Sequence, residues 1–311
     1  MNMVKVRPPY YLNLQSYVHW LGIERPINWD TMFDETGPLE LEIGFGNGES
    51  LLARAPESPN DRFVGLEIAW ASIKRALRRL AKNDIKNVRV LKVDAQLALE
   101  RLFTPKSIDR VVVLFPVPWP KGRHEGRRLF SSDFLRLVGN RLKDGGHIRV
   151  VTDFEPYVEW IFSQIPDTGF EVTQRPISTG IDTKYMRKWR ANGQESFFEL
   201  ILKKTGHHDV PVLEDTDLFT CKLENFDPQA FHPCNEKGPV TVKFKETVYD
   251  QDQKKLLVRA FVAEDRVIQE FWIRVAWEDG AWQVGLAQSS NILPTAGVRR
   301  ALELVREAAE S

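Results

Sequence analysis

The strongest constraint on the fold is a regular alternation of short apolar runs with helical patterns between Leu39 and Lys204. Each run is rich in Val, Ile and Leu and is bounded by glycine, proline or polar residues, which is typical of a buried strand. Strands that alternate with helices in this way form a parallel sheet with helices on both faces. The sequence therefore predicts a doubly wound, mostly parallel α/β domain, with strands at Leu39–Gly44, Arg62–Leu66, Val88–Val93, Arg110–Phe115, His147–Thr152, Gly169–Thr173 and Glu195–Leu202.

The segments between these runs have the spacing of amphipathic helices. In Trp70–Lys82 the apolar residues share one face, and Lys and Arg occupy the other. Ser131 is placed to cap a second helix, which we expect to end at Asp144-Gly145-Gly146. Asp153 is placed to cap a third.

A change of pattern near Lys204–Asp209 predicts a second domain. Beyond it the strand-like runs follow one another directly, with a hairpin signal at Asp279-Gly280 and a final helix from about Pro294. We expect a first domain at 1–205, with an N-terminal arm at 1–37, and a smaller α+β accessory domain at 206–311. The core of the accessory domain is expected to contain Phe271, Trp272, Trp277 and Trp282.

The formal net charge is zero, but the charges are unevenly distributed. Residues 206–311 carry 12 Lys and Arg against 18 Asp and Glu, whereas residues 1–205 carry 31 against 25. A polyanionic partner is therefore expected on the first domain, and the accessory domain is acidic.

Other features of the composition bear on compartment and metal binding. No run approaches the roughly 18 consecutive apolar residues of a membrane span, and the N-terminal segment lacks the apolar core of a signal peptide. We therefore expect a cytoplasmic protein. Cys221 and Cys234 do not make a disulfide framework, and their spacing from the nearby histidines fits no regular zinc pattern, so no metal site is predicted. The oligomeric state stays open.

A glycine-rich turn follows the first predicted strand, where Gly44, Gly46 and Gly48 let the backbone pass close to a ligand. Glu67 ends the next strand, 23 residues after Gly44, where an acidic side chain can accept hydrogen bonds from ribose hydroxyls. Asp94 ends the third strand, where it can meet an adenine amine. The glycine spacing is GxGxG and not the pyrophosphate-binding GxGxxG. This pattern favours a cofactor without phosphate, S-adenosylmethionine, with Glu42 orienting its amino-acid end.

The segment Phe115–Arg128, FPVPWPKGRHEGRR, follows the fourth predicted strand. Its prolines stop the strand, because proline donates no backbone hydrogen bond. An aromatic residue and a cluster of cations at a strand end suit a ligand that carries bases and phosphates, although many charge runs are only solvated loops.

Four motifs occur in order along the chain: Glu42-Ile-Gly-Phe-Gly-Asn-Gly, the Phe115–Arg128 segment, Thr152-Asp153 with Tyr157, and Thr183-Lys184-Tyr185. Together they resemble the bacterial tRNA (guanine-N7) methyltransferase family over residues 35–204. The resemblance implies a seven-stranded class I methyltransferase sheet, S-adenosylmethionine as cofactor, and methylation of guanine 46 in the tRNA variable loop. It implies cofactor contacts from Glu42, Gly44, Gly46, Gly48, Glu67 and Asp94, and substrate contacts from Trp119, Lys121, Arg123, His124, Arg127, Arg128, Asp153, Thr183 and Lys184.

The chain departs from the family pattern at three positions and in its C-terminal domain. The family's presumed catalytic aspartate is replaced by Val117, a substrate-binding glutamate by Met186, and a basic residue by Gly126. Asp153, at the neighbouring strand end, is a candidate to compensate as the catalytic carboxylate. Residues 206–311 are not part of the usual pattern. Two other hypotheses therefore stay open: methylation of another RNA, and a catalytically weak tRNA-binding protein that retains the cofactor site.

Overall fold

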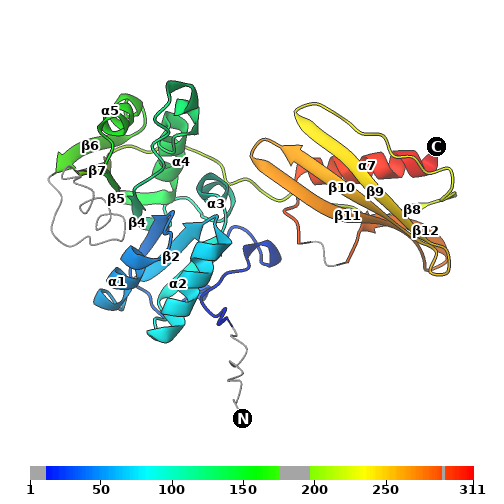
Figure 1. The fold of residues 1–311 in the computed structure, drawn as a ribbon, viewed down its shortest axis with the longest axis horizontal. Coiled ribbons are helices and arrows are strands. Elements are labelled where there is room, and N and C mark those ends of the chain that lie inside the picture. Colours follow the sequence, from blue (N-terminus) through cyan, green and yellow to red (C-terminus); the bar gives the residue numbers. More distant parts are fainter. Residues whose placement is uncertain (1–11, 176–196, 289–290) are drawn as a thin grey trace, which may run out of the picture. The chain divides into compact units, whose positions relative to one another are not determined.

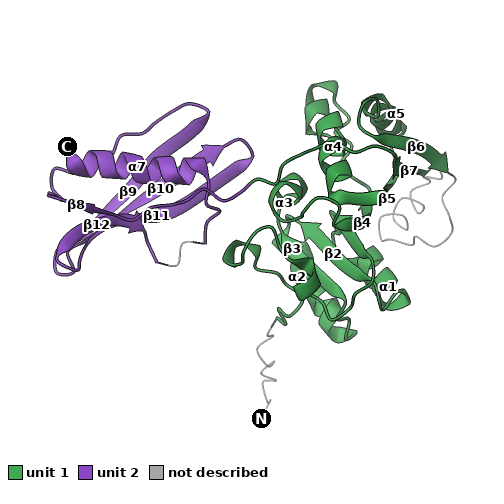
Figure 2. Cartoon of the chain, turned by 180° about the vertical axis from the view of Figure 1, so that it is seen from behind, with its two compact units in different colours: residues 1–213 green, residues 214–311 purple. Residues whose placement is uncertain are grey.

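The structure, a computed structural model, describes residues 12–175, 197–288 and 291–311. It divides into two compact units, Met1–Leu213 (unit 1) and Glu214–Ser311 (unit 2), which are coloured separately in Figure 2. No helix among the described residues is long and apolar enough to cross a membrane.

Unit 1 is built on one seven-stranded sheet with the order β3-β2-β1-β4-β5-β7-β6 (Figure 1). Neighbouring strands are parallel except for β7, which runs antiparallel to both β5 and β6. The predicted doubly wound, mostly parallel sheet is therefore confirmed. The strands are β1 (Leu39–Ile43), β2 (Arg62–Glu67), β3 (Val88–Lys92), β4 (Ile108–Leu114), β5 (Leu142–Thr152), β6 (Phe170–Arg175) and β7 (Phe198–Lys204).

The strand order reverses between β1 and β4. Connections from β1 to β3 run in one direction along the sheet and later ones in the other, so right-handed crossovers place their helices on opposite faces. α1 and α2 share one core with β2 and β3, in which Phe63, Leu77 and Val90 are buried. The helices are α1 (Glu49–Glu57), α2 (Trp70–Lys82), α3 (Ala95–Arg101), α4 (Ser132–Arg141) and α5 (Glu155–Gln164).

Two helix ends differ from the prediction. Ser131 caps α4 as expected, because its side chain accepts a hydrogen bond from the amide of Phe134 at 3.3 Å. The helix ends at Arg141 and not at the Asp-Gly-Gly sequence, since pairing with β4 begins β5 at Leu142. The predicted cap at Asp153 is wrong: α5 begins after Phe154, and no side-chain hydrogen bond caps it.

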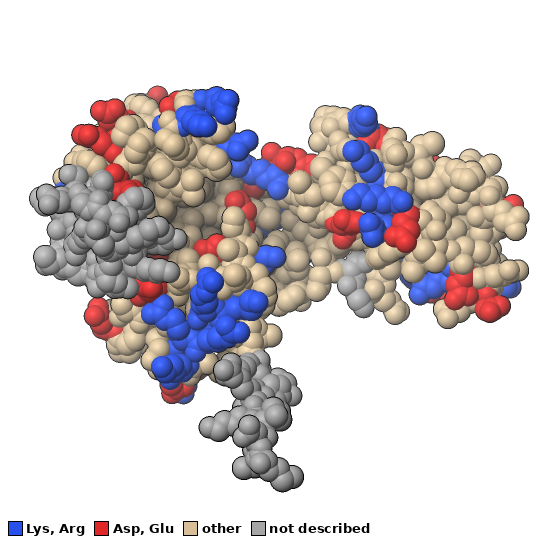
Figure 3. Space-filling model, in the orientation of Figure 1, with Lys and Arg blue, Asp and Glu red and all other residues tan. Residues whose placement is uncertain are grey.

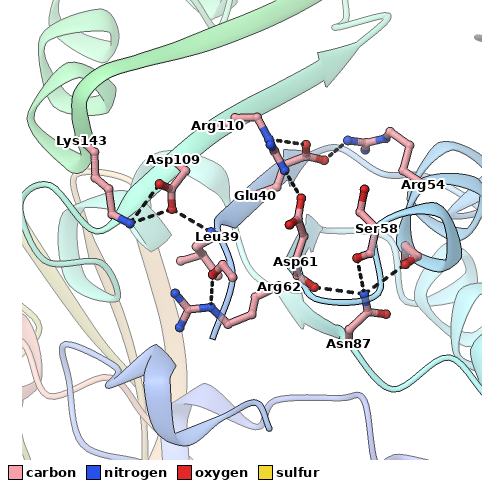
Figure 4. Close-up of polar contacts among 12 residues, drawn as sticks. Leu39, Glu40, Arg54, Ser58, Asp61, Arg62, Asn87, Asp109, Arg110 and Lys143 are labelled. Carbon is pink, nitrogen blue, oxygen red and sulfur yellow. Dashed lines mark hydrogen bonds and ion pairs between the residues drawn. The ribbon is translucent and has the colours of Figure 1, made fainter. Parts of the chain in front are cut away.

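Charged side chains connect the amino-terminal ends of β1, β2 and β4 (Figure 4). The Arg110 guanidinium donates to Glu40 of β1 at 3.1 Å and to Asp61 at 2.5 Å. Arg54 of α1 contacts Glu40 as well. Because Glu40 is buried, these cations compensate a charge that would otherwise be costly to remove from water.

Asn87 joins the strand β3 to the connection between α1 and β2. Its side-chain amide donates to the carbonyls of Ala55, Ser58 and Asp61 at 3.1, 3.2 and 3.0 Å (Figure 4). The glycine-rich turn lies between β1 and α1, and the Asn87 hydrogen bonds fix the other end of α1 and the start of β2.

The division between the units falls after Leu213, eight residues later than predicted. The reason is that the preceding residues pack onto unit 1. The buried Arg141 donates to the carbonyls of Val210 and Pro211 at 2.8 and 3.0 Å, and the Leu213 amide donates to Glu100 at 2.8 Å. The change of sequence pattern near Lys204–Asp209 therefore precedes the boundary between the two compact units.

Unit 2 is a five-stranded antiparallel sheet with the order β8-β12-β11-β10-β9, covered on one face by α7. This agrees with the predicted α+β class. Asp279 and Gly280, at φ of 50° and 77°, form the expected hairpin turn. Trp277 is 44% exposed, and Trp272 alternates with the buried Phe271 and Ile273 and lies outside the core, so the predicted core positions of both are wrong. β8, with three residues, is absent from the predicted strands. The elements are β8 (Cys221–Leu223), β9 (Val240–Asp250), β10 (Lys255–Glu264), β11 (Val267–Glu278), β12 (Ala281–Leu286) and α7 (Ala296–Glu310).

Candidate cofactor and RNA site

The three glycines after β1 all adopt the left-handed backbone conformation. Gly44, Gly46 and Gly48 have φ of 71°, 55° and 74°, values that other residues adopt only with strain. A Cβ at Gly44 or Gly46 would meet no atom within 4 Å, so this side of the turn faces open space. A Cβ at Gly48 would lie 3.1 Å from Ala76, because the turn packs closely against α2. The turn therefore packs closely against α2 on one side and lets a ligand approach its backbone on the other.

The turn forms one wall of a cavity of about 600 Å³ at the carboxyl ends of the strands. Three predicted acids line it: Glu42 from β1, Glu67 from the end of β2, and Asp94 after β3. The same cavity is lined on its other side by Val117, Trp119 and other residues that follow β4. The structure therefore brings the glycine turn, the strand-end acids and the start of the proline-rich loop together.

Glu67 closes the glycine turn through its carboxylate. One oxygen accepts from the Gly46 amide at 3.0 Å, and the other accepts from the amides of Ile68 and Ala69 at 2.8 and 2.9 Å. A carboxylate has about four acceptor sites, so about one remains for a ribose hydroxyl. The expected contact to both hydroxyls requires Glu67 to exchange a backbone amide for a ligand.

Asp94 has two functions that fall on different oxygens. Oδ1 caps α3 by accepting from the amides of Gln96 and Leu97 at 2.9 and 3.2 Å. Within the described chain, Oδ2 accepts no hydrogen bond, and the residue lines the cavity. Its second oxygen is therefore available to an amine.

Glu42 lies almost completely buried at the base of the cavity. Burial raises the pKa of Glu42 to about 8, and a hydrogen bond with Ser50 opposes the rise. The Arg54 guanidinium contacts the carboxylate directly and favours its charged form. Burial also lowers the pKa of Arg54 to about 10. The pair fixes the side chain under the glycine turn.

The charged residues that line the cavity indicate which kind of cofactor it can bind. Among the described lining residues, Glu42, Glu49, Glu67 and Asp94 are acidic and Arg127 is the single cation. Such a lining repels phosphate and attracts a positive group. Carboxylates also suit the hydroxyl and amine donors of a nucleoside amino acid. The residues present therefore fit S-adenosylmethionine, which carries a sulfonium and no phosphate.

The loop after β4 leaves the sheet through two strained residues. Phe115 and Trp119 have φ of 53° and 44°, which is uncommon outside glycine, and both line the cavity. Arg127 lies 5.2 Å over the Trp119 ring, and His124 meets that ring edge-on at 5.7 Å. Residues Gly122–Arg127 form a short 3₁₀ helix, in which Arg123 and Arg127 are exposed, as is Lys121 before it.

Arg128 holds this loop to the domain and is not available to solvent. Its guanidinium is buried, donates to the Pro118 carbonyl at 3.0 Å, and lies over the rings of Tyr157 and Trp160 at 5.7 and 5.3 Å. We therefore remove Arg128 from the expected phosphate contacts. Burial raises the pKa of Tyr157 to about 12, and its hydroxyl accepts from the next loop residue, Leu129, at 3.2 Å.

The remaining predicted residues differ in whether they reach the cavity. Val117 lines the cavity with 62% of its surface exposed, so it presents no carboxylate there. Asp153 follows β5, next to β4, but does not line this cavity. Thr183, Lys184 and Met186 lie outside the described residues.

Several lining residues escaped the sequence analysis, among them Asn47, Glu49, Ser50, Ile68 and Ser72. Asn47 lies inside the glycine motif, and Glu49 and Ser50 are the next two residues, so assigning contacts to the whole motif and extending it by two residues would have found them. Ile68 and Ser72 belong to no recognisable motif, so the sequence does not distinguish them from other Ile and Ser residues.

Comparisons with known proteins identify the family of this chain. A family model described as "Putative methyltransferase" matches residues 36–199. A relative from Chlorobium phaeobacteroides is 45% identical over 56% of this chain and 85% of its own length. Relatives from Thermus thermophilus and Thermotoga maritima are 31% and 29% identical over 90% and 91% of this chain, and 91% and 92% of their own lengths. All three are named tRNA (guanine-N(7)-)-methyltransferase.

The two longer alignments extend into unit 2, since unit 1 accounts for only 213 of the 311 residues. The expectation that residues 206–311 lie outside the family pattern is therefore wrong for these two relatives. By its matched family model and its relatives, the chain belongs to the tRNA (guanine-N7) methyltransferase family.

Proposed function

We propose that this protein transfers a methyl group from S-adenosylmethionine to N7 of a guanine in tRNA, at position 46 of the variable loop. The observation that carries the proposal is a single cavity with two different walls. One wall is the glycine turn with three strand-end acids, and the other is an aromatic loop that bears exposed cations. A tRNA substrate also implies action in the cytoplasm, as the sequence led us to expect.

The first wall holds the methyl donor. Glu67 and Asp94 each have acceptor capacity left for a hydroxyl or an amine, and Glu42 is fixed beneath the turn. When bound, S-adenosylmethionine supplies an electrophilic methyl group on a positively charged sulfur. Glu49, Glu67 and Asp94, which line the cavity, stabilise positive charge inside it.

The second wall orients the guanine. Trp119 offers an aromatic face at the cavity edge, and stacking on such a face holds an unpaired base. Lys121, Arg123 and Arg127 are exposed beside it and are placed for phosphates. Guanine N7 has a lone pair and no proton, so no side chain has to act as a base. The work left to the protein is in-line positioning and stabilisation of the charge that moves onto the purine.

Val117 is one of the positions where this protein differs from the family pattern. A carboxylate there would favour the cationic purine, and loss of one such electrostatic group costs on the order of 10²–10³ in rate in other enzymes. We therefore propose slow transfer that relies on positioning. Asp153, which follows the neighbouring strand β5 but does not line the cavity, is the candidate for a compensating carboxylate.

The test is single-turnover methyl transfer from labelled S-adenosylmethionine to an unmodified tRNA transcript, with N7-methylguanosine identified in the digested product. A transcript with adenine at position 46 is the substrate control. Val117→Asp should raise the rate constant with little change in tRNA affinity, because the added interaction is made mainly in the transition state. If Asp153 already supplies the carboxylate, Asp153→Asn should abolish transfer and Val117→Asp should lower it.

The alternative hypotheses predict different products. Transfer to the control transcript at the same rate would overturn position 46 and point to another guanine or another RNA. No transfer by the wild type or by either variant, together with intact tRNA binding, would overturn the activity. That result would favour the tRNA-binding hypothesis, although a cofactor cavity with intact acids argues for catalysis.

A further inference from the structure

One face of α2 carries a concentration of positive charge that the site described above does not use. The helix has five cations and no acid in 13 residues, and its buried side chains are the apolar residues Ile73, Ala76, Leu77 and Leu80. The cations lie on the opposite, solvent side, and Figure 3 shows the resulting cluster of Lys and Arg over this helix. We define the α2 cationic face as Lys74, Arg75, Arg78, Arg79 and Lys82.

None of these five side chains forms an ion pair with a described residue. Their spacing brings like charges together, because Lys74 and Arg78, Arg75 and Arg79, and Arg78 and Lys82 are four residues apart. Cations at this spacing on a helix repel one another. The helix therefore keeps an unfavourable arrangement that no acidic side chain among the described residues offsets.

The helix α7 shows how the same chain builds an ordinary solvated helix face. Its cations alternate with glutamates, so that Arg299 pairs with Glu303, and Arg300 pairs with Glu303 and Glu307. The contrast indicates that the unpaired charge of α2 is a property of this face and not of the chain's exposed helices in general.

The α2 cationic face adjoins the cavity. Arg75 and Arg79 donate to the side chain and the carbonyl of Asn47 at 3.2 and 3.1 Å. Asn47 belongs to the glycine turn and lines the cavity, and α2 begins three residues after Glu67. The face therefore starts at the cofactor end of the cavity, away from the loop that follows β4.

We propose that the α2 cationic face is a second RNA-binding surface, which contacts backbone phosphates of the same tRNA whose guanine enters the cavity. This inference rests on the proposed function for the identity of the polyanion. Exposed and unpaired cations supply the sequence-independent part of nucleic-acid affinity, by neutralising phosphates and releasing counterions. Contacts on both sides of the cavity orient the RNA better than the β4 loop alone.

The test uses the full chain with three substitutions, Lys74→Gln, Arg78→Gln and Lys82→Gln. These side chains make no hydrogen bond among those that the structure describes, whereas Arg75 and Arg79 support the glycine turn and stay unchanged. The matched control removes three exposed cations from unit 2: Lys222→Gln, Lys237→Gln and Lys243→Gln. Binding of an unmodified tRNA transcript is measured by fluorescence anisotropy at several salt concentrations, and binding of S-adenosylhomocysteine by calorimetry.

If all three α2 side chains contact phosphates, the salt slope should fall by about 2–3, at roughly 0.7–0.9 per contact. The Kd for tRNA at about 0.15 M salt should then rise on the order of 100-fold. Affinity for S-adenosylhomocysteine should stay constant, and the unit 2 control should bind tRNA as the wild type does. An unchanged Kd and salt slope in the α2 variant, or an equal loss in the control, overturns the proposal. Wild-type protein that binds tRNA with this α2 dependence but transfers no methyl group would overturn the proposed function and leave this surface supported.

Discussion

The fully buried guanidinium of Arg141 allows one prediction to be worked out in detail. Besides the Leu99 carbonyl, at 2.8 Å, Arg141 donates to Val210 and Pro211, which lie beyond the last strand of unit 1. A chain that ends at residue 204 keeps every strand of unit 1 but loses both of these acceptors. A chain that ends at residue 213 keeps them.

Each hydrogen bond from a charged group contributes about 1.5–3 kcal/mol, so the shorter chain should be less stable by roughly 3–6 kcal/mol. Domains of this size are stable by about 5–15 kcal/mol, so the loss is a large part of the total. At about 2–4 °C per kcal/mol, Tm should fall by roughly 6–24 °C. Water that enters the space left by the tail can accept hydrogen bonds from Arg141, so the loss of stability should lie toward the lower end of this range.

Urea unfolding of the two chains, followed by circular dichroism, measures the difference. Arg141→Leu in both chains isolates the interaction, because the substitution should cost less in the chain that ends at 204, where two acceptors are already missing. The four proteins form a double-mutant cycle, in which the difference between the two costs of Arg141→Leu gives the interaction energy between Arg141 and the tail. Equal stability of the two chains would show that the tail does not stabilise unit 1. An equal cost of Arg141→Leu in both would show that the tail does not act through Arg141.

Two further predictions concern the cofactor wall. Glu67→Ala should weaken S-adenosylhomocysteine binding by roughly 1.5–3 kcal/mol, about 10- to 150-fold, because a charged acceptor is lost; unchanged affinity in a folded variant would remove Glu67 from the site. Glu42 has its pKa raised by burial, so the stability that its protonated form contributes should be lost as pH rises from about 4.5 through about 8. Glu42→Gln should flatten that part of the urea-unfolding profile, by at most roughly 5 kcal/mol at about 1.4 kcal/mol per pKa unit; parallel profiles would mean that Arg54 keeps Glu42 ionised.

The sheet was predictable because its signals are local and repeated. A buried parallel strand reads as a continuous apolar run, and carboxyl ends of parallel strands meet at one edge. Acids that end successive strands must therefore lie near one another, as Glu67 and Asp94 do around the cavity.

The misplaced residues depend on contacts between distant segments. Nothing local distinguishes Arg128 from Arg127, yet one is buried under aromatic rings and the other is exposed. The boundary after Leu213 depends on Arg141, which is about 70 residues away along the chain. Asp153 has the residue type of a helix cap, but α5 begins one residue too late for it.

The reversal of strand order between β1 and β4 has an evolutionary consequence. The side chains expected to hold the methyl donor come from the chain before β4, and those expected to orient the guanine base come from the loop after it. New substrate preferences can therefore arise by exchanging the segment Phe115–Arg128 while Gly44, Glu67 and Asp94 keep their backbone partners. The residues that bind the methyl donor can therefore stay unchanged on one half of the sheet, while the residues that select the acceptor change on the other half.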